Sequence, residues 1–207
     1  TTHKTLRGPR GGLILSMGNV SNPLSKVDKT INNIPTLIDR AVFPGLQGGP
    51  HMNTILAKAI AFEEALQPEF KKYAEQIILN SKYLAKSLVK KGFKLITNGT
   101  DNHMILIDVV KSFNISGGEA EKILDKIGLN VNKNVIPEDT RHPFDPSGIR
   151  IGTPAATTRG MKEKDMEFLS ECIQDALKNH SNEKKLYEIK NDVATYCKKF
   201  PLPSQNL

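Results

Sequence analysis

The 207-residue sequence contains no tryptophan, and aromatic residues make up only 6% of it. Proteins that hold single-stranded nucleic acid stack its bases on aromatic side chains placed among basic ones. The net charge of +7 suggests such a role, but the lysine pairs lie in separate predicted helices rather than on one aromatic-lined face. We therefore expect solvated helix faces and no nucleic-acid partner, with an anionic small molecule as the second explanation of the charge.

Long hydrophobic runs are absent as well. The longest apolar stretches, residues 13–15 and 104–107, are far shorter than the ~20 residues that a membrane-spanning helix needs. They are typical of buried strands, so we expect no membrane partner. The polar and basic start of the chain predicts no signal peptide.

Cysteine is scarce, and the two that occur, Cys172 and Cys197, are far apart in the sequence. Their spacing is not that of metal ligands, so we expect no metal site. Two free thiols in a reducing compartment are expected, with a single disulfide as the alternative, and we expect the protein to be cytoplasmic.

Hydrophobic periodicity predicts an α/β fold in which helices lie beside a small, mostly antiparallel sheet. Ser116 and Glu119 predict a capping box, and a domain boundary is expected at residues 66–67, giving domains 1–66 and 67–207. The loop predicted at residues 41–50 holds two prolines and three glycines. Strands are predicted at 13–17, 93–97, 104–110, 130–136 and 149–153, and helices at 21–38 (in part), 51–66, 68–92, 116–127, 162–180 and 183–198.

The first twelve residues, TTHKTLRGPRGG, place Lys4 directly before a glycine-rich turn. Lysine forms Schiff bases with carbonyl compounds when desolvation or a neighbouring positive charge frees its amine. A lysine taken alone is usually a solvated side chain, and the adjacent His3 does not change that. The turn itself needs no ligand to explain it.

Two further segments could bind anions. In PGLQGGP, the N–H groups of Gly48 and Gly49 could line a phosphate site before a helix start, although a simple turn explains the same residues. This segment is neither a dinucleotide nor a Walker motif. In GIRIGTP, Arg150 lies within an apolar strand, where a buried guanidinium requires either a carboxylate or phosphate ligand or an internal ion pair.

The remaining candidates are weaker when judged from the residues alone. His103, at the start of a strand, fits a structural histidine better than a catalyst. Residues 132–134 could bind a heterocycle or shape a loop. Asp101 and Asp108 have no partner at a catalytic spacing, so we expect them to be solvated or to cap helices.

Taken in order, the segments TTHKTLRGPRGG, AVFPGLQGGP, TDNH, VNKN and SGIRIGTPAATTRG closely resemble serine hydroxymethyltransferases. The resemblance runs from residue 1 to at least residue 160 and corresponds to the C-terminal half of that family. It implies the fold of type I pyridoxal-phosphate enzymes, which is aspartate-aminotransferase-like. Residues 1–66 would then be part of the large cofactor-binding domain, and residues 67–207 the small C-terminal domain.

The resemblance also implies roles for individual residues. Lys4 matches the lysine that holds pyridoxal 5'-phosphate, and His3 matches a histidine that influences substrate specificity. Arg150 matches the arginine that binds the amino-acid carboxylate. Gly48 and Gly49 match a loop that reaches the cofactor phosphate from the neighbouring subunit. The other implied contacts are Arg10 to the cofactor, and Asn134, Pro143 and Phe144 to folate.

The implied reaction converts serine and tetrahydrofolate into glycine and 5,10-methylenetetrahydrofolate, in a homodimer or tetramer. The family's acidic partner of the pyridine nitrogen and its ring-stacking histidine have no match here, so we expect a fragment that is inactive by itself. The chain also departs from the family pattern at the longer segment 21–38, at Asn53 and at His142. The rival interpretations are another type I pyridoxal-phosphate enzyme, such as an aldolase, and a basic module that binds RNA or protein.

Overall fold

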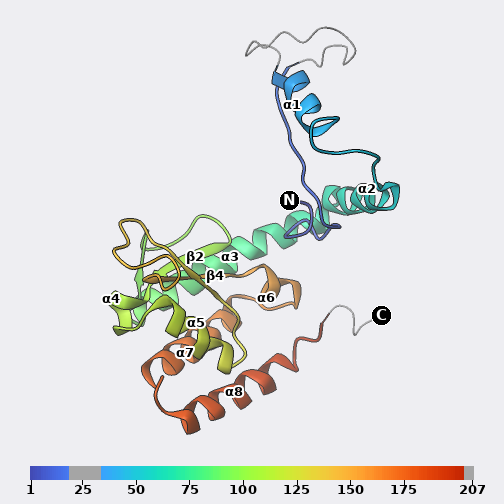
Figure 1. Cartoon of the computed structure of the whole chain (residues 1–207). Helices are drawn as coiled ribbons and strands as arrows, with labels where there is room; N and C mark the ends of the chain where they lie inside the picture. The colour runs from blue at the N-terminus through green and yellow to red at the C-terminus, as the bar shows by residue number, and fades with distance from the viewer. Residues whose placement is uncertain (19–33, 203–207) are drawn as a thin grey trace. The chain divides into compact units, whose positions relative to one another are not determined.

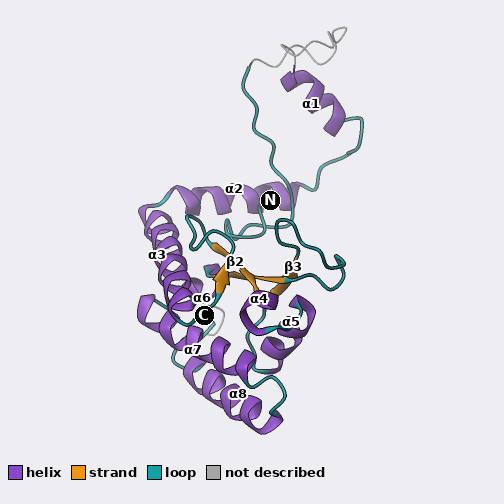
Figure 2. Cartoon of the chain, turned by 90° about the vertical axis from the view of Figure 1, so that its left-hand side faces the viewer, coloured by secondary structure: helices purple, strands orange, loops and turns teal. Residues whose placement is uncertain are grey.

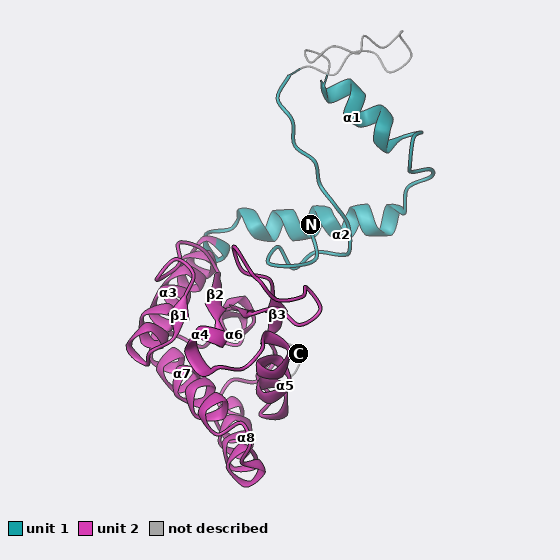
Figure 3. Ribbon diagram, turned by 60° about the vertical axis from the view of Figure 1, so that its left-hand side comes forward, with its two compact units in different colours: residues 1–70 teal, residues 71–207 magenta. Residues whose placement is uncertain are grey.

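The computed structural model describes residues 1–18 and 34–202. The chain divides into two compact units, Thr1–Phe70 and Lys71–Leu207, which are coloured separately in Figure 3.

The first unit contains the N-terminal turn and two helices, α1 (Ile34–Val42) and α2 (Met52–Leu66). Helix α2 confirms the helix predicted from residue 51. Helix α1 extends two residues into the segment 41–50, and the rest of that segment is a loop, as predicted. Most of the partly helical segment predicted at 21–38 lies outside the described residues.

The strand predicted at residues 13–17 is wrong. This segment has no strand pairing, and its apolar side chains are exposed, with Leu15 at 85% and Met17 at 94%. A strand is stable only when its backbone groups pair with a neighbour, and the apolar sequence alone does not supply one. Helix α2 likewise buries only Ala61 within the described residues, so its apolar side chains are largely uncovered.

The second unit is an α/β structure, as expected, whose helices pack beside one sheet (Figure 1). Its long helices confirm the predicted ones, and the predicted capping box is present, since Glu119 N donates to Ser116 Oγ at 3.1 Å and Ser116 N donates to Glu119 Oε2 at 2.8 Å. Two short helices, α4 and α6, were not predicted. The helices are α3 (Pro68–Lys90), α4 (Val109–Phe113), α5 (Gly117–Lys126), α6 (Pro154–Thr158), α7 (Glu163–Lys178) and α8 (Glu183–Cys197).

The sheet is antiparallel throughout, which confirms the expected small antiparallel sheet, and its strand order is β1-β2-β4-β3. Three predicted strands are too long, and the fourth, predicted at 149–153, is displaced by one residue. Residues 109 and 110, predicted as strand, begin α4 instead, because Asp108 caps that helix by accepting a hydrogen bond from Lys111 N at 2.9 Å. The strands are β1 (Lys94–Leu95), β2 (Met104–Asp108), β3 (Asn132–Asn134) and β4 (Gly148–Gly152).

The core lies between the sheet and helices α3, α5, α7 and α8, and the last three are on one side of the sheet in Figure 2. Successive side chains of a strand point to opposite faces of a sheet. In β4 this alternation buries Ile149 and Ile151 in the core and leaves Arg150 exposed between them. The sheet therefore has one apolar face toward the helices and a mixed face, on which Arg150 lies beside Leu106 of β2.

A buried polar network joins α3 to the segment that follows β4. The fully buried Asn80 donates through Nδ2 to Thr157 Oγ1 and to Met161 O, both at 2.9 Å. Thr153 Oγ1 donates to Ile77 O at 3.0 Å. These bonds satisfy polar groups that would otherwise be buried without partners, and they fix the end of β4 against α3.

No helix among the described residues is long and apolar enough to cross a membrane. Cys172 and Cys197 are both free, so the alternative disulfide is not present. The described part of the chain also holds no cluster of side chains suited to a metal ion.

Candidate functional site

Lys4 lies at the corner of a turn that is tied closed at its base by one residue, Thr2. Thr2 is fully buried; its N–H donates to Gly11 O at 3.1 Å and its hydroxyl donates to Pro9 O at 2.7 Å. Its carbonyl accepts from Gly8 N at 2.7 Å. The side chain of Lys4 is exposed on this closed turn, so the amine is held on a defined backbone and remains accessible.

The turn needs glycine at position 8, because there its own backbone and helix α2 approach closely. A Cβ added at Gly8 would lie 2.8 Å from Thr2 O and 3.2 Å from the Cβ of Ala61, on α2. A Cβ added at Gly11 would lie 2.5 Å from Lys58 Nζ, also on α2. The turn therefore packs on α2, and Lys58 is a second lysine beside it.

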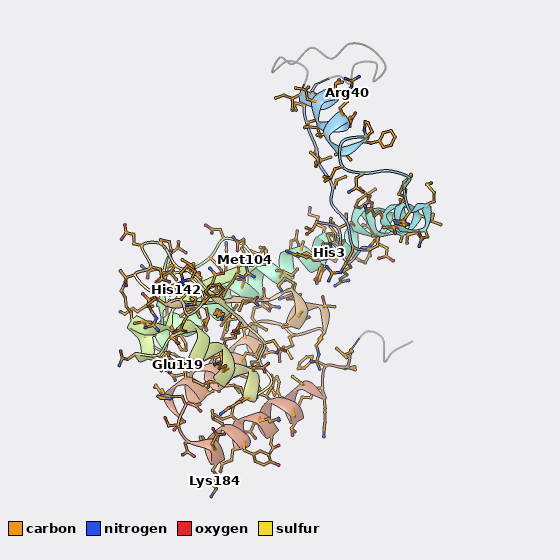
Figure 4. The ribbon with its side chains drawn as sticks, in the orientation of Figure 1. His3, Arg40, Met104, Glu119, His142 and Lys184 are labelled. Atoms are coloured by element: carbon orange, nitrogen blue, oxygen red, sulfur yellow. The ribbon has the colours of Figure 1, made fainter. Side chains whose placement is uncertain are left out.

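His3 is half-buried, and its Nδ1 accepts a long hydrogen bond from Gly11 N at 3.4 Å. This bond orients the ring along the turn next to Lys4, and Figure 4 labels His3 there. Arg10 is exposed on the far arm of the same turn. Three of the residues singled out from the sequence thus belong to one closed turn, whereas the anchoring role of Thr2 and the position of Lys58 were not predicted. Nothing in the local sequence marks either residue.

Gly48 and Gly49 lie in the loop before α2 and are exposed, and a Cβ at either position would meet nothing within 4 Å. The preceding turn is fixed to α1, since Leu46 N and Gln47 N both donate to Val42 O. Among the described backbone bonds outside helices and strands, neither glycine N–H has an acceptor. Within the described backbone bonds, both N–H groups are therefore open to an anion.

Arg150 contradicts one expectation drawn from the sequence, because its side chain is exposed rather than buried. Its guanidinium donates to Asn132 Oδ1 at 3.2 Å, from the directly paired residue on β3. None of the ion pairs formed by the described residues includes Arg150. The internal ion pair considered from the sequence is thus not formed there, and the guanidinium has donors left for a ligand.

The candidate folate residues lie on β3 and on the loop between β3 and β4 of the second unit. Asn134 ends β3, opposite Gly148 of β4, and its Nδ2 donates to Val135 O at 2.7 Å. The loop that follows exposes Pro143 and Phe144, the latter by 78%, and the ring of Phe144 stacks on His142 with centroids 5.3 Å apart. The departure from the family at His142 therefore places a second ring beside Phe144.

Asp108 has a structural role, whereas His103 makes a backbone bond and Asp101 a surface ion pair. The carbonyl of His103 accepts from Thr153 N at 3.2 Å, Asp108 caps α4, and the exposed Asp101 lies 3.9 Å from Lys82 Nζ. Asn53 is exposed in the first turn of α2.

The candidate residues thus form two groups. Lys4, His3, Arg10 and the glycine pair belong to the first unit, and Arg150 with the residues of the β3–β4 region belongs to the second. Both groups lie within residues 1–173, which match a family model described as serine hydroxymethyltransferase. The match covers most of the chain, and we conclude that this protein belongs to the serine hydroxymethyltransferase family of pyridoxal-phosphate-dependent transferases.

Proposed function

We propose that this chain takes part in the reversible conversion of serine and tetrahydrofolate into glycine and 5,10-methylenetetrahydrofolate. The observation that carries the proposal is the exposed Lys4 on a turn closed by Thr2, at the start of a segment that matches the family. The second unit adds an exposed arginine without an ion-pair partner among the described residues.

The residues of the first unit fit pyridoxal 5'-phosphate. Lys4 has the accessible amine that would hold the cofactor's aldehyde, and His3 is oriented beside it by Gly11 N. The open N–H groups of Gly48 and Gly49 would bind the phosphate of the cofactor held by a neighbouring subunit, since backbone N–H groups without side chains can approach an anion closely. Arg10 would add positive charge on the same turn. When bound, the cofactor supplies an electron sink for negative charge at the amino acid's α-carbon.

Arg150 would bind the carboxylate of serine or glycine. Its planar guanidinium can donate two parallel hydrogen bonds to a carboxylate, and Asn132 already restricts its position. Holding the carboxylate fixes the orientation of the α-carbon and therefore which of its bonds can react. Asn134, Pro143 and Phe144 would contact tetrahydrofolate, with the stacked rings of Phe144 and His142 offering an aromatic face to a heterocycle.

We further propose that residues 1–66 belong to a large cofactor-binding domain and residues 67–207 to a small C-terminal domain of a type I pyridoxal-phosphate fold. The acidic partner of the pyridine nitrogen, the ring-stacking histidine and the groups nearest the reacting carbon would come from outside this chain. The working enzyme would be a cytoplasmic homodimer or tetramer. This chain by itself would not turn over serine.

The test compares enzyme that contains this chain within a complete site with its Lys4→Ala variant. We expect glycine formation from serine to require tetrahydrofolate, and the cofactor's absorbance band to be lost in Lys4→Ala but kept in Lys58→Ala. Cleavage of β-hydroxy amino acids without any response to tetrahydrofolate would instead indicate an aldolase of the same fold. Salt-sensitive binding of single-stranded RNA, without cofactor uptake, would indicate a nucleic-acid-binding module.

A further inference from the structure

The loop between β3 and β4, residues 135–147, is closed by the carboxylate of Asp139. Oδ2 accepts from Ile136 N at 3.3 Å and from Ser147 N at 2.9 Å, near the two ends of the loop. Oδ1 accepts from Arg141 N at 3.0 Å and from Ser147 Oγ at 2.7 Å. One side chain therefore joins the start, the middle and the end of the loop.

These four bonds use the full acceptor capacity of the carboxylate, which has about four lone-pair sites. Partial burial raises the pKa of Asp139, but the hydrogen bonds from Ser147, Arg141 and Ile136 outweigh it and lower the pKa to about 2. The group is thus an anion at neutral pH, and bonds to an ionised acceptor are stronger than those between neutral groups.

The base of the loop is also fixed to the frame of the second unit. Gly117 N donates to Pro146 O at 2.7 Å, and Val109 N donates to Ser147 O at 3.0 Å. The ends of the loop are therefore rigidly held.

The tip of the loop, in contrast, is exposed. His142, Pro143 and Phe144 are all exposed, and Figure 4 labels His142. Two contacts hold the tip. Lys133 Nζ, on β3, donates to Phe144 O at 2.8 Å, and the guanidinium of Arg141 forms an ion pair with Asp145 and donates to Asp145 O at 3.0 Å. Because Arg141 N is itself bound by Asp139, the carboxylate determines where the segment with the two stacked rings begins.

We propose that Asp139 is a positioning residue for the folate-binding loop: by joining Ile136, Arg141 and Ser147 it fixes Pro143 and Phe144 relative to Asn134. This inference rests on the proposed function, since it assumes that Phe144 contacts tetrahydrofolate. Asp139 itself is not expected to touch substrate or cofactor. A displacement of about 1 Å in a substrate-positioning segment can cost up to about a hundredfold in rate.

The experiment measures steady-state kinetics of the holoenzyme that contains this chain, for wild type, Asp139→Asn, Asp139→Glu and Glu138→Gln. In Asp139→Asn, we expect KM for tetrahydrofolate to rise at least about tenfold. KM for serine should change less than about twofold, and tetrahydrofolate-independent cleavage of a β-hydroxy amino acid should keep its kcat. Asp139→Glu keeps the charge and should recover part of the loss. Glu138→Gln is the matched control, because Glu138 is an exposed neighbour in the same loop, and should behave as wild type.

An unchanged KM for tetrahydrofolate in a folded Asp139→Asn variant would overturn the inference, as would a uniform loss that includes the tetrahydrofolate-independent reaction. If Asp139→Asn does not fold, Ser147→Ala replaces it, because it removes only the 2.7 Å bond from the hydroxyl. A smaller rise in KM for tetrahydrofolate is then expected, and no rise would refute the role of Asp139. A wild-type enzyme that does not use tetrahydrofolate would refute the proposed function instead.

Discussion

Replacing Asn80 with alanine should destabilise the second unit by about 3 kcal/mol, because its side chain is the central member of a buried polar network. Asn80 is fully buried on α3, and its amide makes three hydrogen bonds. The two that it donates reach α6 and the residue where the chain turns toward α7, so the network joins three segments of the unit.

The size of this destabilisation follows from what each hydrogen-bond partner of Asn80 loses in the variant. Gln76 Nε2 keeps its other bond, to Glu163 Oε2 at 3.1 Å, and Thr157 Oγ1 keeps its bond to a backbone carbonyl. These two losses should each cost about 0.5–1 kcal/mol. Among the described hydrogen bonds, the carbonyl of Met161 accepts only the one from Asn80. Leaving a buried polar group without a hydrogen-bond partner costs about 1–3 kcal/mol. The sum is about 3 kcal/mol.

The assay is urea unfolding followed by far-UV circular dichroism, since the sequence has no tryptophan to report by fluorescence. The matched control is Lys86→Ala, an exposed position on the same helix, for which a change within about 0.5 kcal/mol is expected. Asn80→Asp should be at least as damaging as alanine, because it places a negative charge opposite the carbonyl of Met161. If the free energy of unfolding of Asn80→Ala falls by less than about 1 kcal/mol, with an unchanged m-value, the buried network does not stabilise the unit as argued.

Three further predictions concern other parts of the structure. In Gly117→Ala, the new Cβ would overlap the backbone carbonyl at the start of β4. We therefore expect urea unfolding to show a free energy of unfolding lower by about 1–3 kcal/mol. The control Gly99→Ala, whose Cβ position is open, should show almost no change. The pKa of Asp139 lies at about 2 instead of 3.8, so the ionised carboxylate contributes fully to stability above about pH 4, and this contribution is lost as the pH falls toward 2. In Asp139→Asn, the free energy of unfolding should therefore depend less on pH between about 2 and 5. The same pH dependence as in wild type would contradict this. Burial, and then nearby carboxylates, raise the pKa of the Cys172 thiol to about 12, so a thiol reagent at pH 8 should modify Cys197 readily and Cys172 only in urea; equal rates in the native protein would show that Cys172 is accessible.

The sequence predicted the helices well because their signals are local. Apolar periodicity set the cores of α3, α7 and α8, and the pair Ser116 and Glu119 located the start of α5. Strand ends were predicted less well, since pairing with a neighbour decides them. The segment 13–17 shows this most clearly: its apolar residues suit a buried strand, but the described chain pairs no strand with it.

The candidate site divides in the same way. Lys4, Gly48 and Arg150 could be chosen from motifs, but Arg150 was expected to be buried and is exposed. Side chains alternate along a strand, so a position between the core residues Ile149 and Ile151 should have indicated this exposure. The bonds that hold Lys4 and the β3–β4 loop depend on Thr2 and Asp139. An aspartate in a proline-rich loop suggests a local turn, but its bonds to Ser147, eight residues away, depend on the folded loop.

The strand order β1-β2-β4-β3 has a consequence for how the second unit assembles during synthesis. Strands β1 and β2 are close neighbours in the chain, as are β3 and β4, so each pair can form early from local contacts. The central pairing of β2 with β4 joins residues that are 40 to 48 positions apart, and it must wait until Gly152 has left the ribosome. We therefore expect Arg150 to reach its place only in the last step of sheet formation, when β4 docks beside β2 and the two halves of the sheet become one.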